Sequence, residues 1–160
     1  MKRDPAKAPA PSPEEQLAGF IDKFTPELAA LIRAVRKKLR ARLRGTLELV
    51  YDNYNFFVIG YSPDERPSSA IFSIAAQAKG VSLCFLQGKG LPDPEGLLRG
   101  SGNLVRNLPV ESAAALDRPA VSALIDAALK AAKTRVDPRT PHQLIIRSVS
   151  AKQRPRRQAR

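Results

Sequence analysis

The spacing of the apolar residues changes at Gly45, and this change limits the fold more than any other feature of the sequence. Before Gly45, apolar residues recur every three or four positions, in Leu28, Leu31, Ile32, Val35, Leu39 and Leu43. That period is typical of one face of an α-helix. After Gly45, apolar and polar residues alternate over short segments, which is typical of half-buried strands. The sequence therefore predicts helices first and then a group of consecutive strands.

Two helices are expected before Gly45. Ser12 and Glu15 have the spacing of a capping box, and Pro13 suits the first position of a helix. Thr25 and Pro26 repeat this start signal. We expect a short first helix and a longer second one that ends near the glycine, because glycine readily adopts the positive φ of a helix C-terminus.

Four strands are expected in succession after Gly45, over residues 46–51, 54–61, 69–78 and 81–86. Lys79-Gly80 is predicted to form a two-residue hairpin connection, and short connections imply antiparallel neighbours. A fifth strand is expected over 103–110, at a sheet edge because Pro109 has no backbone N–H to donate. Residues Leu144–Val149 are expected to form a sixth strand or an ordered segment docked on the core.

The stretch 85–108 holds five of the nine glycines, with Pro92 and Pro94 between them. Such a backbone forms either an ordered excursion between strands or a flexible tether. The leucines within the stretch favour the ordered excursion.

A last helix is expected after Asp117, which we predict as its cap, with Pro119 near its start. The predicted fold class is α+β, an antiparallel sheet of about five to six strands with two N-terminal helices and one C-terminal helix. Residues 1–11 are expected to be a disordered leader, 12–150 a single domain, and 151–160 a basic disordered tail.

The net charge of +12 is concentrated in two segments. Residues 33–44 include seven basic residues and no acidic one, and residues 133–160 include nine basic residues against Asp137. Localised basic surfaces of this kind favour nucleic acid or another polyanion as the partner, engaged by the basic helix and the tail. For the helix alone, a solvated face whose arginine stems cover apolar surface is the favoured interpretation, and the acid-free tail shifts the balance toward a polyanion. The candidate polyanion-binding residues are Arg33, Arg36, Lys37, Arg40, Lys152, Arg154, Arg156 and Arg157.

Tyr51, Asn53 and Tyr54 form the most unusual polar and aromatic cluster. Such side chains at a strand turn can stack on, or hydrogen-bond to, a small ligand or a base. A plain hairpin turn is the favoured alternative, because Asp-Asn suits turns and tyrosine suits strands.

Lys89 and Arg99 lie in the glycine-rich stretch, where backbone N–H groups can cradle an anion. Gly88-Lys89-Gly90, however, matches neither a phosphate-binding P-loop nor a dinucleotide-binding fingerprint. A structural excursion is therefore the favoured interpretation of this stretch.

No catalytic constellation is expected. Cys84 and His142 are the single cysteine and the single histidine, and neither has a neighbouring group that would complete a nucleophilic site. One cysteine also excludes an intramolecular disulfide and a cysteine-clustered metal site. We predict no enzyme activity, no cofactor and no metal site. The longest apolar runs fall far short of the ~18 residues that span a bilayer, so we predict no membrane span and a cytoplasmic location.

One part of the sequence is similar to a known family. The run from Gly90 to Gly102, then Arg106-Asn107-Leu108, then the helix expected over 117–129 resembles the YdhG-like domain of unknown function (DUF1801) family. The resemblance covers residues 14–133 and implies a small α+β fold with a curved antiparallel sheet. The family's usual tryptophan-glycine-methionine-proline run is replaced here by the segment 51–55, Tyr-Asp-Asn-Tyr-Asn.

Some members of this family are described as frataxin-like iron chaperones, which implies an alternative function. Iron would be held by carboxylates, because hard cations prefer oxygen ligands. The carboxylates of the first helices are Glu14, Glu15, Asp22 and Glu27. The predicted function is a non-enzymatic binding module whose basic surface contacts nucleic acid or another polyanion. The alternative is a small-molecule or metal-binding protein that uses the concave face of the sheet.

Overall fold

A six-stranded sheet is the centre of the structure, a computed structural model that describes residues 9–158. The strands lie in the order β5-β4-β3-β2-β1-β6. Their bounds are β1 Leu47–Asp52, β2 Phe57–Ser62, β3 Phe72–Gln77, β4 Gly80–Phe85, β5 Arg106–Val110 and β6 Leu144–Val149. Strands β1 to β5 pair antiparallel with their sequence neighbours.

Strand β6 pairs parallel to β1, which makes the sheet mixed although mostly antiparallel. Helix α3 and the segment 132–143 lie between β5 and β6, and a connection of this length can return the chain in the same direction as β1. The predicted α+β class is confirmed. The predicted antiparallel pairing holds for β1 to β5, and β6 departs from it.

The two N-terminal helices begin where their capping signals predict. The helices are α1 Pro13–Asp22, α2 Pro26–Arg42 and α3 Pro119–Ala131, with short 3-10 helices η1 Pro67–Ser69 and η2 Ala113–Asp117. The hydroxyl oxygens of Ser12 and Thr25 accept hydrogen bonds from backbone N–H groups of the first turns of α1 and α2. Asp117 does not cap α3, because it ends η2 and its carboxylate pairs with Lys38 instead.

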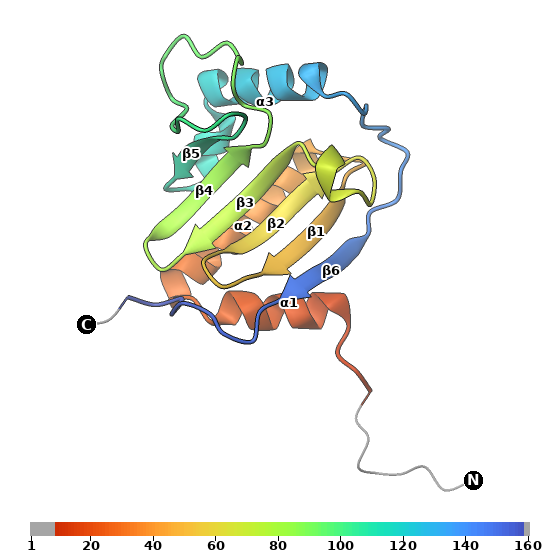
Figure 1. Cartoon of the computed structure of the whole chain (residues 1–160), viewed down its shortest axis with the longest axis vertical. Coiled ribbons are helices and arrows are strands. Elements are labelled where there is room, and N and C mark those ends of the chain that lie inside the picture. Colours follow the sequence, from red (N-terminus) through yellow and green to blue (C-terminus); the bar gives the residue numbers. More distant parts are fainter. Residues whose placement is uncertain (1–8, 159–160) are drawn as a thin grey trace, which may run out of the picture.

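Helix α2 covers one face of the sheet, while α1 lies at one end of the sheet and α3 at the other (Figure 1). Ile32, Val35 and Leu39 of α2 are buried in the same apolar cluster as Ile59 and Ile74 of the sheet. The helical face predicted from the apolar spacing is therefore the face that packs on the strands.

The glycine-rich stretch is an ordered excursion between β4 and β5, as predicted. Leu91, Leu97 and Leu98 pack against the core. A Cβ atom at Gly88 would lie 2.7 Å from the Cβ atom of Arg106, so the two segments meet too closely for a side chain there. Strand β5, which contains Pro109, lies at the edge of the sheet, as predicted.

The β3–β4 turn differs by one residue from its prediction. Gln77 pairs with Gly80, so Ala78 and Lys79 form the turn and Gly80 begins β4. Most of the expected disordered leader lies outside the described residues. No helix within residues 9–158 is long and apolar enough to cross a membrane; the cytoplasmic location stays a prediction.

Candidate polyanion-binding groove

The seven cations of α2 and its C-terminal turn differ in whether they pair with carboxylates and in whether they line a groove. Lys38 pairs with Asp117 and Arg42 pairs with Asp126, so the side of α2 next to η2 and α3 has its charge neutralised. Lys38 and Arg42 are four residues apart and share one face of the helix. They attach α2 to its neighbours and are not free for a partner.

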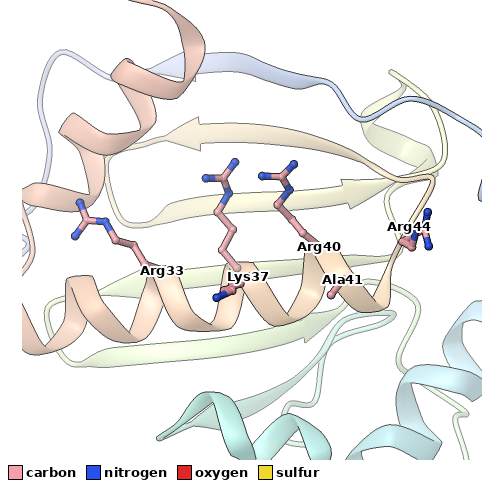
Figure 2. Close-up of a pocket in the computed structure, with 6 residues that line it drawn as sticks. Arg33, Lys37, Arg40, Ala41 and Arg44 are labelled. Carbon is pink, nitrogen blue, oxygen red and sulfur yellow. The ribbon is translucent and has the colours of Figure 1, made fainter.

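A row of cations lines a groove of about 430 Å³ along another face of α2. The row consists of Arg33, Lys37 and Arg40, which follow one another along the helix in Figure 2, and Arg44, which lies just beyond the C-terminal end of the helix. Arg33 pairs with Asp22 at one end of the row. Lys37 and Arg44 form no ion pair with any residue between 9 and 158. We name this feature the basic groove.

Arg36 also lines the basic groove, but its guanidinium is already bound. Its Nη2 lies 2.8 Å from Oε1 of Glu48 and its Nε lies 3.0 Å from Oε2 of the same carboxylate. The same guanidinium donates to both carboxylate oxygens of Glu14. Arg36 is one of the predicted polyanion-binding residues, and in the structure its guanidinium is engaged by the carboxylates of Glu14 and Glu48.

Glu48 is fully buried beneath the groove and is the centre of a polar cluster that sequence reasoning missed. Besides Arg36, the phenol of Tyr61 donates to Oε2 of Glu48 at 2.9 Å, and Nε2 of His142 lies 2.7 Å from Oε1. Nε of Arg40 lies 3.8 Å from Oε1, beyond hydrogen-bond distance. An acidic residue on the inward face of an apolar strand, in a chain rich in arginine, was the available signal.

The charges of this cluster are fixed by its contacts. Burial alone would raise the pKa of Glu48, but the hydrogen bonds and charge of Arg36, with the hydrogen bonds from His142 and Tyr61, hold it below its usual range. Burial beside the negative charge of Glu48 raises the pKa of Tyr61 well above its ordinary value. Burial opposes the charged form of Arg36, and Glu48 and Glu14 outweigh it, so the pKa of Arg36 is raised. Because Glu48 is ionised, Nε2 of His142 is the donor of their hydrogen bond.

A second cavity of about 290 Å³ adjoins the basic groove at the C-terminal end of α2. Arg40 and Arg44 line both the groove and this cavity. Thr140 and His142, from the segment before β6, line its other side, and Glu48 lines it from β1. The structure thus brings His142 to the basic groove, which the sequence did not indicate.

The tail is ordered where the sequence predicted disorder. Arg156 is buried, and its Nη2 donates to Oδ1 of Asp52 at 2.9 Å and to the backbone oxygen of Asn53 at 2.6 Å. Gln153 donates to the backbone oxygen of Asp52. The dark blue C-terminal segment runs beside α1 in Figure 1, where Nε of Arg157 donates to the backbone oxygen of Lys23. The predicted disordered tail was wrong for residues 151–158, because one buried arginine and several backbone contacts attach it.

The other tail cations remain at the surface. Lys152, Arg154 and Arg157 are exposed. The guanidinium of Arg154 lies over the ring of Tyr54, 5.7 Å from its centroid. Of the predicted polyanion-binding residues in the tail, only Arg156 is removed from the surface.

The ligand candidates of the β1–β2 turn form the hairpin turn that was favoured for them. The backbone N–H of Asn53 donates to the backbone oxygen of Phe56, and the Oδ1 atom of Asn53 accepts from Ser148 of β6. Tyr51 pairs with Val58 across the two strands, and half of Tyr54 is exposed. These side chains close the turn and contact β6.

Lys89 and Arg99 lie apart from the basic groove, in the β4–β5 excursion. The backbone of Arg99 exchanges two hydrogen bonds with Asn107, and the backbone N–H of Lys89 donates to Leu104. Both side chains are exposed. Their backbone bonds support the structural role favoured for this stretch.

Cys84 and His142 are not brought together. Cys84 lies on β4, where burial raises the pKa of its thiol and a hydrogen bond with Ser73 partly offsets the rise. Strands β3 and β2 separate β4 from β1, where His142 meets Glu48. Within the described part of the chain, no three side chains of His, Cys, Asp or Glu gather in a way that could hold a metal ion.

Comparison with known proteins gives no assignment. No protein-family model matches the chain, and neither a curated protein nor a solved structure is significantly similar to it. The resemblance to the YdhG-like family therefore stays a prediction.

Proposed function

We propose that this protein is a binding module for polyanions and that nucleic acid is the partner class it fits best. The single observation that carries the proposal is the basic groove, where four cations follow one another along α2 and the turn after it. Two of them, Lys37 and Arg44, have no ion pair with the residues described. Cations without carboxylate partners retain their charge for a ligand, because no internal carboxylate competes for it.

The length of the row suits the backbone of one nucleic-acid strand. Arg33 and Arg42, the last residue of α2, are nine residues apart, which is about 14 Å along the helix, and Arg44 lies in the turn beyond it. At 3.4 Å per phosphate of one strand, this length spans about five phosphates. Four contacts on a single strand predict that the logarithm of affinity falls with the logarithm of salt with a slope of about −3.

We propose binding rather than catalysis because the titratable cluster beside the groove is saturated. Glu48 is fully buried and accepts hydrogen bonds from Arg36, Tyr61 and His142. A carboxylate with these partners holds the helix, the sheet and the segment before β6 together. It has no oxygen left to exchange a proton with a substrate.

The test is fluorescence anisotropy of labelled single-stranded and duplex DNA and RNA across a salt series. Lys37→Gln and Arg40→Gln are each expected to weaken binding of every probe and to reduce the salt slope by about 0.7 to 0.9. Arg118→Gln is the matched control, because Arg118 is exposed at the start of α3, outside the groove. No binding at low salt, or an equal loss for the control, contradicts the proposal.

The contribution of the tail is tested without deleting it, since Arg156 is part of the fold. Replacement of Lys152, Arg154 and Arg157 together by glutamine removes the exposed tail charge and keeps the buried arginine. If the tail engages the same polyanion, affinity falls further and the slope becomes shallower than in the intact chain. An unchanged slope restricts the binding surface to the basic groove.

A second candidate function, binding of a small molecule, is favoured by a separate cavity of about 260 Å³. It lies between η1 and the C-terminal end of α3, with Ile71, Ala128 and Ala132 as apolar walls and Gln87 and Lys133 as polar groups. Apolar walls with few polar groups are usual for small-molecule pockets. A saturable rise in melting temperature with a small ligand, abolished by Ala131→Leu at the cavity wall, supports this candidate.

A further inference from the structure

We propose that the basic groove ends in a seat for a phosphomonoester, formed by Arg40, Arg44, Thr140 and His142 in the cavity of about 290 Å³ at the end of α2. This inference rests on the proposed polyanion binding and names the part of the ligand that the protein distinguishes. The seat takes the phosphate at the end of a nucleic-acid strand or the phosphate of a free nucleotide, which present the same chemistry.

The segment 137–142 lies against the turn that follows α2, at this end of the groove. Gly45, at φ +93°, lies so close to it that a Cβ atom there would be 2.1 Å from the backbone oxygen of Asp137. Pro138, Thr140 and His142 of this segment line the cavity opposite Arg40 and Arg44. A strand that follows the cations of α2 toward Arg44 therefore meets this segment, where the end of the strand can enter the cavity.

Two guanidinium groups with donors to spare line the cavity. Arg40 approaches Glu48 only to 3.8 Å, and Arg44 has no ion pair within the described residues. Each guanidinium carries five N–H donors, and a phosphomonoester offers three acceptor oxygens and up to two negative charges. A phosphodiester inside a strand offers one charge and fewer free oxygens, so the two arginines favour the end of a strand.

His142 supplies the directional contact. Its Nε2 donates to Oε1 of Glu48, and in the imidazolium form, which carries a proton on each ring nitrogen, Nδ1 donates to a phosphate oxygen. The hydroxyl of Thr140 makes no hydrogen bond within residues 9–158, whereas that of Thr46 donates to the backbone oxygen of Leu43. Thr140 is therefore the hydroxyl in the cavity that is available to a phosphate oxygen.

The charges that face the imidazole favour an anion despite the carboxylate beneath it. Glu48 of β1 is neutralised by Arg36 and is hydrogen-bonded to Tyr61 of β2. Asp137, on the same segment as His142, is engaged by Arg139. Arg36 is shared with Glu14, Arg40 approaches Glu48 to 3.8 Å without a hydrogen bond, and Arg44 has no ion pair within the described residues.

The experiment compares single-stranded oligonucleotides of one sequence that end in a 5′-phosphate, a 3′-phosphate or hydroxyls only, by fluorescence anisotropy. We expect a phosphate at one of the two ends to raise affinity about tenfold over the hydroxyl-ended strand, the effect of one or two charge-assisted hydrogen bonds. Inorganic phosphate and a nucleoside monophosphate serve as competitors. If either competitor displaces the strand, free phosphate is a ligand of the seat. If neither does, the seat binds only the phosphate at the end of a strand.

His142→Gln keeps a donor for Glu48 but lacks the second ring nitrogen, so it is expected to abolish most of the preference for the phosphate end. Thr140→Val is the second variant and is expected to reduce the preference without disturbing Glu48. Arg33→Gln, at the far end of the groove, is expected to weaken all probes equally and to leave the ratio unchanged. Melting temperatures establish that each variant folds.

The outcomes separate this inference from the proposed function. Equal affinity for all three strands overturns the phosphate seat and leaves polyanion binding standing. A preference for the phosphate end that neither His142→Gln nor Thr140→Val reduces has the same meaning. If no strand binds at low salt, polyanion binding fails. In that case a nucleoside monophosphate that binds the wild type and not Thr140→Val supports the seat alone, and one that does not bind overturns it.

Discussion

Two buried carboxylates on β1, Glu48 and Asp52, face the same side of the sheet but are neutralised in different ways. They are four residues apart, so the period of two places both on one face of the strand. Glu48 is matched by an arginine fork from α2, a phenol and an imidazole, and each donor reaches a carboxylate oxygen. Together these donors satisfy both carboxylate oxygens of Glu48. The cluster thereby supports α2 and the groove that lies along it.

At Asp52, the hydrogen bonding of the charge partners is less complete. Nζ of Lys23 lies 2.7 Å from Oδ2, and Nη2 of Arg156 lies 2.9 Å from Oδ1. The Nε and Nη1 atoms of Arg156 are buried without a hydrogen-bond partner in the described residues. An unpaired buried donor costs stability, so the tail contact is weaker than the number of its charges indicates. The comparison indicates that a buried charge pair stabilises less when some of its donors have no acceptor.

The largest expected effect is that of Arg36→Ala. This substitution leaves Glu48 buried without its main counter-charge and is expected to lower the free energy of unfolding by about 3–5 kcal/mol. Urea denaturation measures the change. The matched control is Arg33→Ala, whose ion pair with Asp22 is exposed and should contribute about 0.2–1 kcal/mol. A loss for Arg36→Ala as small as that of the control would remove the contrast between the two carboxylates.

A smaller loss, of about 1–2 kcal/mol, is expected for Arg156→Ala. Lys23 remains beside Asp52, and the substitution also removes two unpaired buried nitrogens. Thermal and urea unfolding measure the loss. A loss of unfolding free energy as large as that of Arg36→Ala would mean that bound water satisfies those two nitrogens. No loss would mean that residues 151–158 do not dock in solution.

Acid is expected to weaken the Glu48 site. The pKa of Glu48 is lowered in the folded state, so its stabilising effect is complete at neutral pH. It is lost as the pH falls below the ordinary glutamate pKa of about 4.3 and through the lowered value in the folded protein. Plots of unfolding free energy against pH should be shallower in this range for Glu48→Gln than for wild type.

Of the three expected effects, this one is the smallest as long as the wild type and Glu48→Gln both remain folded. The reason is that a protonated Glu48 carboxyl keeps part of its hydrogen bonding. Glu111→Gln is the control, since Glu111 is exposed and its substitution should leave the slope unchanged. An equal change of slope in the two variants would mean that the pH dependence reflects total charge rather than the buried cluster.

The parts of the structure that the sequence predicts are those set by local spacing. The apolar period places α2 on the sheet, and Ser12 and Thr25 mark the starts of α1 and α2. Strand β6 also has the bounds expected for it, Leu144–Val149. Its direction was not predictable, because the apolar pattern of a strand is the same in either orientation.

The contacts of the candidate site could be predicted only in part. A basic row on α2 follows from the sequence, but which cations stay free depends on carboxylates elsewhere in the fold. Glu48 and His142 are 94 residues apart, and Asp52 and Arg156 are 104 residues apart. Residues 151–158 have no apolar period that would predict docking, since one arginine and several backbone hydrogen bonds hold them.

The position of β6 determines the order in which the chain can finish folding during its synthesis. The ribosome makes β1 long before β6, although the two are neighbours in the sheet. Until residue 149 has emerged, the outer edge of β1 has no strand to pair with, and unpaired edges are where chains aggregate. His142 and Arg156, which flank β6, arrive with it and supply the last partners of Glu48 and Asp52. Closure of the sheet edge and completion of both carboxylate sites are thus a single late event.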